Sequence, residues 1–349
     1  MKRFLNLIYA AVTALLFLSC QEGTRKEMPL LNPDALNVIL DTDLGNDIDD
    51  IIAMDILYKY QDMGKVNFLS VMLNKEGRYA HRYADILNTW YGYPNTPIGI
   101  ITDAAECYGE SGYYTKKTCL MTDESGNPLF KGSLDKYYDL PEAVTLYRKI
   151  LSSMPDGSVT IASVGFSTNL ARLLESGPDM YSPLPGVELV KQKVRLLSVM
   201  AGNFQDPSYA EFNVVKDIPA AQKVFKDWPG QIVVSPWELG VQVRYPYASI
   251  ESDFSWAKNN PAVEGYKNYR AMPYDSPTWD PTAVLYAVDN DGYFTESEPG
   301  TIAVQDSGTV LFTPSASGLH RYLSISEQQI PRVVDHFVKT FSQKPKWMN

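Results

Sequence analysis

The sequence contains few of the residues that bind soft metals or form thiol and imidazole catalytic pairs. It has 3 cysteines and 3 histidines among 349 residues. The histidines, His81, His320 and His336, are scattered and lack the spacing of metal ligands. Neither Cys107 nor Cys119 has a histidine near it in sequence, so a catalytic cysteine is not indicated. These counts favour a site built from other residue types.

A basic patch is also lacking. The net charge is −10, and a surface that reads phosphates needs clustered lysine and arginine. We therefore expect no nucleic-acid partner, while the acidity alone indicates little beyond solubility. The hydrophobic content of 45% is ample for a core, and the chain is long enough for one large domain or two.

The longest apolar run, Leu5 to Leu18, is too short to span a membrane comfortably, because a span needs about 20 residues. It follows Lys2 and Arg3 and has the layout of a secretory signal. Cys20 then resembles the modified cysteine of a bacterial lipoprotein box. We predict a signal peptide over 1–19, a tether over 20–36 and one domain over 37–349. The protein would be exported and lipid-anchored, in the periplasm or at the outer membrane or cell surface, with simple secretion as the alternative.

Two cysteines remain once Cys20 carries a lipid. Cys107 and Cys119 flank a loop rich in glycine and tyrosine. An oxidising compartment would permit a disulfide between them, which contributes ~3 kcal/mol in the loop-entropy model. Two unpaired thiols are the alternative.

Strand-like and helix-like segments alternate along the chain, which indicates βαβ units and a mainly parallel, open α/β sheet flanked by helices. The segment 106–136 looks like a surface excursion. The predicted strands are 37–40, 66–72, 97–101, 159–163, 194–199, 231–235, 301–304 and 309–312. The predicted helices are 51–60, 79–91, 140–152, 168–175, 219–226, 282–288 and 327–341.

The segment Asp41–Asp50 places five aspartates within ten residues, directly after the apolar run Val38–Leu40. Such a run predicts a buried strand that delivers its acids at the carboxyl edge of the sheet, where open α/β sheets bind ligands. Carboxylates this close repel each other unless a cation lies among them or some are protonated. A hard divalent ion such as Ca²⁺ or Mg²⁺ fits this need.

Three further segments carry polar groups that a purely structural protein would not require. Asn74 follows a predicted strand. Glu211 and Asn213 alternate around a phenylalanine, so on an extended segment both would face one side. Asp280 stands in an irregular loop that opens a helix, where it would serve either as the helix cap or as a metal ligand.

Taken in order, these blocks resemble the inosine-uridine-preferring nucleoside hydrolases. The aspartate segment resembles the family signature, and the agreement continues at Asn74, 163–170, 210–213 and Asp280-Pro281, over about residues 37–290. Here 44–48 replaces a shorter Pro-Gly link of better-known members. Asp43, Asp49 and Asp50 therefore align with the family, and Asp47 is an extra carboxylate.

The resemblance implies a set of roles. It implies a Ca²⁺ ion held by Asp43, Asp50, Asp280 and the carbonyl of Val164, with Asp49 taking a proton from a water bound to the ion. It implies hydrolysis of the N-glycosidic bond of ribonucleosides or related N-ribosides, through an oxocarbenium-like state that carboxylates stabilise. The ribose hydroxyls would be held by Asn74, Glu211, Asn213 and, less directly matched, Asn203.

Two departures from the family pattern bear on the leaving group. Purine-accepting relatives carry a histidine before the last metal-binding aspartate, where this chain has Trp279. An indole stacks on a base ring but does not deliver a proton. The acid would then come from elsewhere, with Tyr209, Tyr274 and Asp275 near in sequence, or the leaving group departs without one. The link before Glu211 is also shorter than usual, so the match of Asn203 is open.

Several other interpretations of these motifs remain. An EF-hand loop does not fit, because Asn46 stands where its sixth-position glycine should be. A phosphatase of the haloacid-dehalogenase type would use Asp41 as nucleophile with Mg²⁺, but would leave Glu211 and Asn213 unexplained. The main alternative is a non-catalytic lipoprotein that binds a nucleoside or ribosyl ligand. A monomer and a homo-oligomer are both compatible with the sequence.

Overall fold

A computed structural model describes residues 31–104, 113–134 and 137–348, and the unit that they form spans Asn32–Asn349. The predicted signal peptide 1–19, Cys20 and Cys107 lie outside the described residues. Cys119 is buried, with its Sγ 3.9 Å from the carbonyl oxygen of Tyr79. No helix of the described part is both long enough and apolar enough to cross a bilayer.

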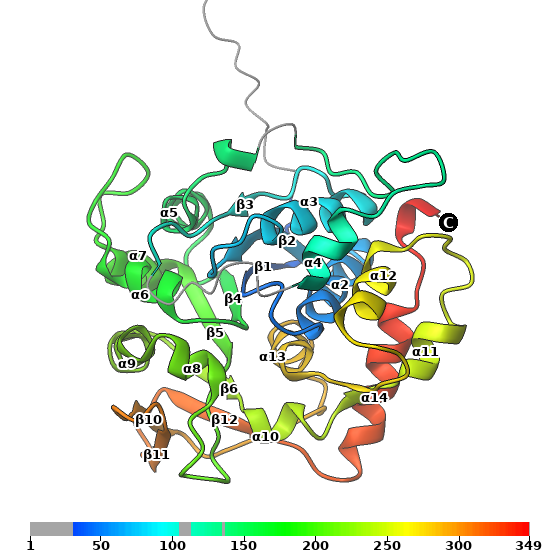
Figure 1. Cartoon of the computed structure of the whole chain (residues 1–349). Coiled ribbons are helices and arrows are strands. Elements are labelled where there is room, and N and C mark those ends of the chain that lie inside the picture. The colour runs from blue at the N-terminus through cyan, green and yellow to red at the C-terminus, as the bar shows by residue number, and fades with distance from the viewer. Residues whose placement is uncertain (1–30, 105–112, 135–136, 349) are drawn as a thin grey trace, which may run out of the picture. The chain divides into compact units, whose positions relative to one another are not determined.

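A mixed, mainly parallel sheet forms the centre of the unit (Figure 1). Its strands are β1 (Leu36–Thr42), β2 (Val66–Leu73), β3 (Ile98–Gly99), β4 (Val159–Ser163), β5 (Val194–Met200), β6 (Ile232–Ser235), β9 (Thr295–Glu296), β10 (Gly300–Val304), β11 (Val310–Pro314) and β12 (His320–Ser324). They pair in the order β11-β10-β12-β6-β5-β4-β1-β2-β3, with β9 on β12. All pairs from β12 to β3 are parallel, which confirms the predicted fold class.

The central strands are buried along nearly their whole length because helices cover both faces of the sheet. Every residue of β2 and β4 is buried, as expected for strands that read as continuous apolar runs. In the register of β1, Asp41 lies beside Met72 of β2 and Ser163 of β4. The carboxyl ends of these three strands therefore meet at one edge.

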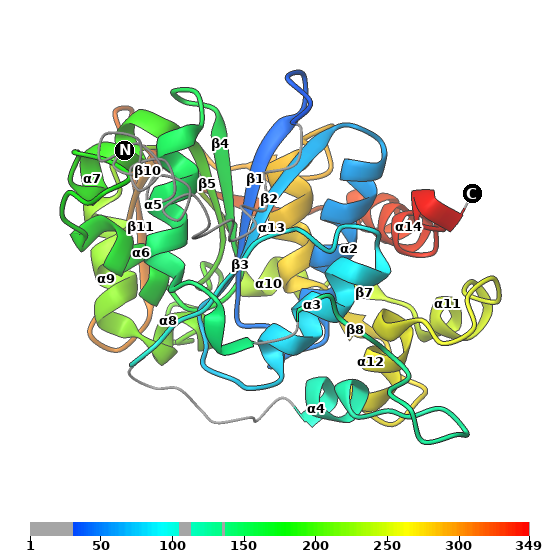
Figure 2. The same cartoon turned by 90° about the horizontal axis from the view of Figure 1, so that it is seen from above.

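Helices lie on both sides of the sheet (Figures 1 and 2). One group contains α2, α13 and α14, and the other contains α5, α6, α7 and α9. The helices are α2 (Asp49–Asp62), α3 (Ala80–Trp90), α4 (Tyr113–Cys119), α5 (Ala143–Ser153), α6 (Thr168–Glu175), α7 (Gly186–Lys193), α8 (Phe212–Lys216), α9 (Ile218–Asp227), α10 (Trp237–Gly240), α11 (Tyr247–Ser252), α12 (Pro261–Tyr269), α13 (Trp279–Val288) and α14 (Gln329–Phe341). Short 3₁₀ turns lie at Tyr137–Asp139 and Lys346–Met348, and the two-residue strands β7 (Arg244–Tyr245) and β8 (Ser276–Pro277) pair separately.

The segment predicted as a surface excursion is only partly one. Its helix α4 packs against α12 and α3, and it buries Tyr114 and Thr118. The hydroxyl of Tyr114 donates a hydrogen bond to the carbonyl oxygen of Asp47 at 2.8 Å. Apolar and hydrogen-bonding contacts thus tie this segment to the acid-rich loop, which its polar composition did not predict.

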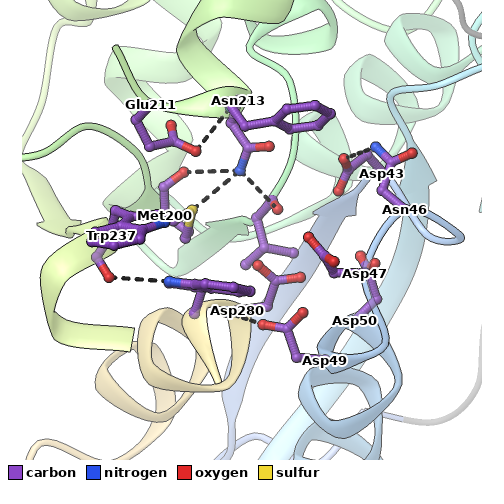
Figure 3. A pocket seen from close by; sticks show the side chains of 13 residues that line it. Asp43, Asn46, Asp47, Asp49, Asp50, Met200, Glu211, Asn213, Trp237 and Asp280 are labelled. Atoms are coloured by element: carbon purple, nitrogen blue, oxygen red, sulfur yellow. Dashed lines mark hydrogen bonds between the residues drawn. The ribbon is translucent and has the colours of Figure 1, made fainter. Parts of the chain in front are cut away.

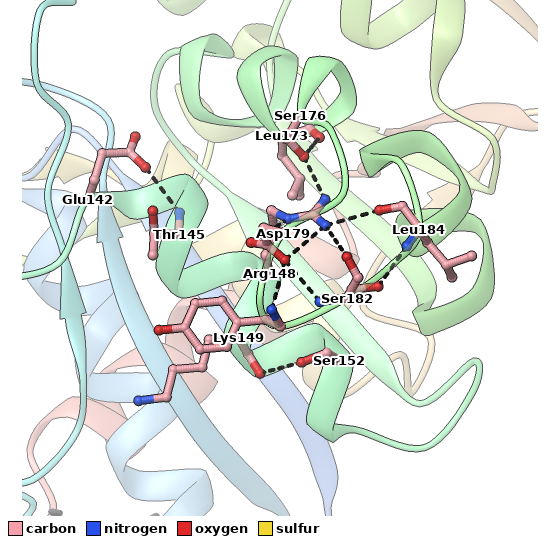
Figure 4. Close-up of polar contacts among 11 residues, drawn as sticks. Glu142, Thr145, Arg148, Lys149, Ser152, Leu173, Ser176, Asp179, Ser182 and Leu184 are labelled. Carbon is pink, nitrogen blue, oxygen red and sulfur yellow. Dashed lines mark hydrogen bonds and ion pairs between the residues drawn. The ribbon is translucent and has the colours of Figure 1, made fainter.

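A buried arginine holds the loop that joins α6 to α7 (Figure 4). Arg148 of α5 pairs with both carboxylate oxygens of Asp179, at 2.8 and 3.1 Å. It also donates to the hydroxyl of Ser176 at 2.9 Å and to the carbonyl oxygens of Ser182 and Leu184 at 3.0 Å. Hydrogen bonding from Arg148 lowers the pKa of Asp179. These five residues, the Arg148 cluster, form a buried charge with its counter-charge in place.

Candidate active site

The acid-rich loop lies between β1 and α2 at the carboxyl edge of the sheet, as predicted. Gly45 turns the loop with φ +110°, a backbone region that residues with a side chain rarely adopt. Asp49 and Asp50 occupy the first turn of α2, where the positive end of the helix dipole favours acids. Thr42 donates a hydrogen bond to Oδ1 of Asp50. The loop and helix together present their carboxylates at one edge.

Asp280 reaches these acids from the far end of the sequence because α13 packs along α2. Its backbone N–H donates to Oδ2 of Asp49 at 3.0 Å. The helix begins at Trp279, so Asp280 lies in its first turn, and Thr278 before it makes no side-chain capping bond. The predicted loop up to Pro281 is therefore wrong, and of the two roles expected for Asp280 the helix cap does not apply. The side chain joins the acids of the N-terminal loop instead.

Three of these carboxylates form a group that fits a hard cation. Asp43, Asp50 and Asp280 are buried and offer oxygens within 4.8 Å of one another. Ca²⁺ binds oxygens at about 2.3–2.6 Å, so two ligands of one ion lie at most about 5 Å apart. Oδ2 of Asp50 has no hydrogen-bond partner among the described residues. A buried acceptor without a donor, beside two further carboxylates, matches the donor set of Ca²⁺.

The electrostatics of these carboxylates also favour a bound cation. Burial raises the pKa of Asp49, Asp50 and Asp280 well above the usual range, and that of Asp43 to about 6. Repulsion between neighbouring carboxylates raises these pKa values further, and the ammonium of Lys75 opposes it at Asp43 and Asp50. Without a cation the group retains protons, and binding of a cation would release them.

A small cavity of about 70 Å³ opens over the acids (Figure 3). Figure 3 shows the labelled aspartates on one side, with Glu211, Met200 and Trp237 on the other. The lining residues, which we call the pocket, are Asp43, Asn46, Asp47, Asp49, Asp50, Val164, Met200, Glu211, Phe212, Asn213, Trp237, Trp279 and Asp280.

Glu211 lines the pocket, but the backbone conformation predicted for it from the sequence is wrong. It is not part of an extended segment: it is the N-cap residue of α8, and Asn213 belongs to the helix. The Glu211 carboxylate accepts backbone hydrogen bonds from Asn213 at 2.9 Å, Gly202 at 3.2 Å and Val214 at 3.3 Å. Burial raises its pKa to about 7, against the effect of these bonds. The alternation that suggested a strand is instead a capped helix start.

Asn213 and Val164 meet inside the pocket. The amide nitrogen Nδ2 of Asn213 lies 3.3 Å from the carbonyl oxygen of Val164, the predicted main-chain ligand. Val164 directly follows β4, and Gly165 comes next. A Cβ atom on Gly165 would lie 2.6 Å from Oδ1 of Asn74 and 2.6 Å from the backbone nitrogen of Asp43. The backbone just after β4 thus lies so close to the acid-rich loop that no side chain fits at position 165.

Two predicted substrate-binding residues do not line the pocket. Asn74 is buried behind it and donates to Oδ1 of Asp41 at 2.5 Å. Asn203 accepts bonds from the backbone nitrogens of Gln205 at 3.0 Å and Asp206 at 2.8 Å, so it shapes a turn. Both lie within the neighbourhood that the sequence indicated, but neither side chain is part of the cavity wall.

Asp41 is also outside the pocket. Its second oxygen accepts from the hydroxyl of Tyr147 at 2.8 Å and from Asn169 at 3.1 Å. Burial raises its pKa to about 7. A fully buried carboxylate with both oxygens engaged has no access to a phosphate ester, so this geometry disfavours the phosphatase interpretation.

The extra carboxylate, Asp47, does line the pocket. The hydroxyl of Tyr269 donates to its Oδ1. Beside it, Asn46 donates to Asp43 and accepts from the ammonium of Lys75 at 2.6 Å. Tyr269 ends α12, so a distant helix fixes the insertion that distinguishes this loop.

Several pocket residues were not predicted from the sequence. Trp237 follows β6 at a carboxyl end, and this position after a strand was the available signal. Met200 ends β5 in the same way. Phe212 was read only as the spacer between Glu211 and Asn213. The proton donors considered from sequence, Tyr209, Tyr274 and Asp275, are not among the lining residues.

The comparisons with known proteins agree with the geometry. The sequence profile of the family described as "Inosine-uridine preferring nucleoside hydrolase" matches residues 38–316. No curated protein is similar in sequence at a significant level.

Three solved structures show the same fold. A plant nucleoside hydrolase, PpNRh1, has 19% identity and a TM-score of 0.65, over 88% of this chain and 99% of that one. A purine-preferring ribonucleoside hydrolase from Gardnerella vaginalis has 16% identity and a TM-score of 0.67, over 88% and 98%. The type III effector protein XopQ, complexed with adenosine diphosphate ribose, has 13% identity and a TM-score of 0.59, over 90% and 95%.

Proposed function

The chain belongs to the inosine-uridine preferring nucleoside hydrolase family, and we propose that it hydrolyses the N-glycosidic bond of ribonucleosides or related N-ribosides. The observation that carries this proposal is the convergence of Asp280 with Asp43 and Asp50 at the carboxyl edge of the sheet. Burying several carboxylates together costs free energy unless something neutralises them. Carboxylates that meet in a cavity from distant parts of the sequence therefore indicate a ligand site.

The proposed cofactor is Ca²⁺, held by Asp43, Asp50, Asp280 and the carbonyl oxygen of Val164. When bound, the ion neutralises the acids and makes water a better nucleophile. Oδ2 of Asp50, which is buried and has no hydrogen-bond partner among the described residues, gives further support for this site.

The chain's own residues would supply the remaining steps. Asp49 is the proposed base: its Oδ2 is fixed by the N–H of Asp280, and the carboxylate takes a proton from the water that attacks C1′. Glu211 and Asn213 would hold ribose hydroxyls and so orient the sugar. The surrounding carboxylates stabilise the positive charge that develops on the sugar ring. Trp279 is the proposed contact for the leaving group.

A direct test measures ribose released from a panel of nucleosides by the soluble unit, with Ca²⁺ and with EDTA. We expect release by the wild type, loss with EDTA, and loss in Asp49→Asn with ligand binding retained. Asp206→Asn is the matched control, because Asp206 is exposed and lies outside the pocket. Ribose release that survives EDTA or Asp49→Asn would refute the assigned roles.

A second candidate is a binding protein that retains the cation site but does not turn over. The XopQ structure, which holds adenosine diphosphate ribose on the same fold, is the observation that favours it. Binding of nucleosides or adenosine diphosphate ribose that depends on Ca²⁺, without ribose release from any N-riboside, would select this alternative.

We also propose export and lipid anchoring through Cys20. The support is the sequence alone: a basic start, a short apolar run and a lipobox-like Ser19-Cys20. Mass spectrometry of the mature N-terminus checks this proposal. A diacylglyceryl modification on Cys20 is expected, and a mature chain that keeps residues 1–19 would contradict it.

A further inference from the structure

The two sides of the pocket differ in chemistry, and this difference bears on the leaving group. On the premise of the proposed hydrolysis, we infer that the preferred substrates are N-ribosides of a cationic aromatic base, of which a pyridinium N-riboside is the simplest type. Three observations carry this inference: the charge of the pocket, its aromatic wall, and the kinds of polar group that it contains.

The pocket has a large excess of negative charge. Six carboxylates line it, while no lysine, arginine or histidine is among the lining residues that the structure describes. One divalent cation at Asp43, Asp50 and Asp280 offsets only part of this charge. Asp47, Asp49 and Glu211 then remain, opposed by the single ammonium of Lys75 on Asn46, and their net field favours a positively charged ligand over a neutral one.

Aromatic side chains make up much of the rest of the pocket. Trp237, Trp279 and Phe212 line it. The indole N–H of Trp279 donates to the carbonyl oxygen of Trp237 at 3.0 Å, so the only donor of that ring is already engaged. The ring of Tyr209 packs on Trp237, with centroids 4.8 Å apart, and supports it from behind. Tryptophan faces attract cations, most strongly when water is excluded.

The described lining has no histidine, lysine, tyrosine or cysteine that could protonate a leaving base. Its uncommitted carboxylates are placed as acceptors. Glu211 accepts three backbone N–H groups, Asp49 accepts the N–H of Asp280, and Asp47 accepts the hydroxyl of Tyr269. A neutral base that leaves with the bonding electron pair becomes an anion and requires a proton.

A pyridinium N-riboside avoids this requirement. Water attacks C1′ and its proton passes to Asp49, while the C1′–N bond breaks with its electron pair moving to nitrogen. The nitrogen loses its positive charge, and the base leaves as a neutral pyridine without taking a proton. The products are ribose, the neutral base and one proton, so the reaction needs no oxidant or reductant.

The test compares kcat/KM for nicotinamide N-riboside, its neutral dihydro form, uridine, inosine and 4-nitrophenyl riboside. The dihydro compound matches the shape of the first but lacks its charge. The nitrophenyl compound needs no acid and reports whether the hydrolytic machinery works. We expect the pyridinium riboside to exceed uridine, inosine and the dihydro form by at least tenfold.

The outcomes separate this inference from the proposed function. Cleavage of 4-nitrophenyl riboside, with uridine or inosine equal to or better than the pyridinium compound, overturns the inference and leaves the hydrolase intact. Cleavage of none of the five compounds overturns both.

Substitutions in the aromatic wall provide an internal check. Trp237→Leu should lower kcat/KM for the pyridinium riboside about fivefold more than for 4-nitrophenyl riboside. Trp279→His introduces a proton donor and should raise the ratio of uridine to pyridinium activity. Each result is a ratio of two substrates on one protein sample, so a partly unfolded variant does not affect it. Unchanged ratios in both variants would overturn the inference.

Discussion

The guanidinium of Arg148 and the carboxylates of the pocket are both buried charges, but only the guanidinium has its counter-charge within the fold. Arg148 is 3% exposed, and its guanidinium meets a carboxylate, a hydroxyl and two carbonyl oxygens. In the pocket, carboxylates from α2 and α13 face one another, and Oδ2 of Asp50 has no donor. Burial of a charge is tolerated when it is paired, so three carboxylates that converge without a counter-charge indicate a partner from outside the chain.

The comparison also separates stability from function. Removing a charge that the fold itself neutralises, such as Arg148, should lower the free energy of unfolding. Removing an unneutralised carboxylate of the pocket should instead lower binding and turnover. Substitutions in each region test this division.

The largest effect is expected for Asp50→Asn. Turnover should fall on the order of a thousandfold, because a bound cation supplies several kcal/mol to the transition state. The metal-free variant should be at least as stable as the wild type, since one repelling carboxylate is gone. Calorimetry should show that Ca²⁺ no longer raises its Tm.

Asp55→Asn is the control for that variant. Asp55 is a buried acid on the same helix but does not line the pocket, so its variant should keep the response to Ca²⁺. A lost response in Asp55→Asn, or a retained one in Asp50→Asn, would break the comparison.

A smaller effect is expected for Arg148→Ala. The free energy of unfolding should fall by about 2–3 kcal/mol, because Asp179 and two buried carbonyl oxygens lose their donor. Turnover per folded molecule should stay within about twofold, since none of these residues lines the pocket. Urea unfolding and ribose release measure the two quantities.

The matched control for this second variant is Arg244→Ala. Arg244 is exposed and donates a hydrogen bond to the carbonyl oxygen of Asp275 at 3.2 Å. Its loss should change the free energy of unfolding by less than about 0.5 kcal/mol. An Arg148→Ala protein as stable as this control would show that the cluster contributes nothing.

The smallest effect concerns a third buried charge. Burial raises the pKa of Asp55 to about 7, and Lys59 one turn later opposes this. The folded state therefore keeps a proton that the unfolded chain releases near the ordinary pKa of 3.8, and stability falls as pH rises between these values. Between pH 5 and pH 8, the free energy of unfolding of Asp55→Asn should rise by about 1 kcal/mol or more relative to that of the wild type. Unfolding should be measured in saturating Ca²⁺, so that the pocket carboxylates do not contribute to the pH dependence. A difference in the free energy of unfolding between Asp55→Asn and the wild type that stays constant with pH would refute the raised pKa of Asp55.

Local patterns predicted most of the fold. The strand Val159–Ser163 and the helix Thr168–Glu175 occur with the predicted bounds. The helix Pro261–Tyr269 was missed although Asn260 caps it, because the isolated Asn-Pro signal precedes a segment with little amphipathic pattern. The strand His320–Ser324 was missed because it is short and half polar.

The site was predictable where it follows from strand ends and not where it depends on packing. The acids Asp43, Asp49 and Asp50 lie beside their strand in sequence, so their place followed from the sheet. Tyr269 reaches Asp47 only because α12 returns to the acid loop, and no local pattern encodes that contact. Glu211 was predicted as a site residue from the motif around it, although its segment was predicted to be extended and instead begins a helix.

Gly165 gives a means to separate the ligands of this site from their arrangement. Because the backbone of β4 passes so near Asn74 and Asp43, one added methyl group would push the chain apart while every carboxylate stayed in the sequence. An engineer who wished to retune the pocket should diversify the tryptophans and leave this glycine fixed. Conversely, Gly165→Ala should give an inactive protein that keeps every acidic group of the site and differs from the native protein by only one methylene group.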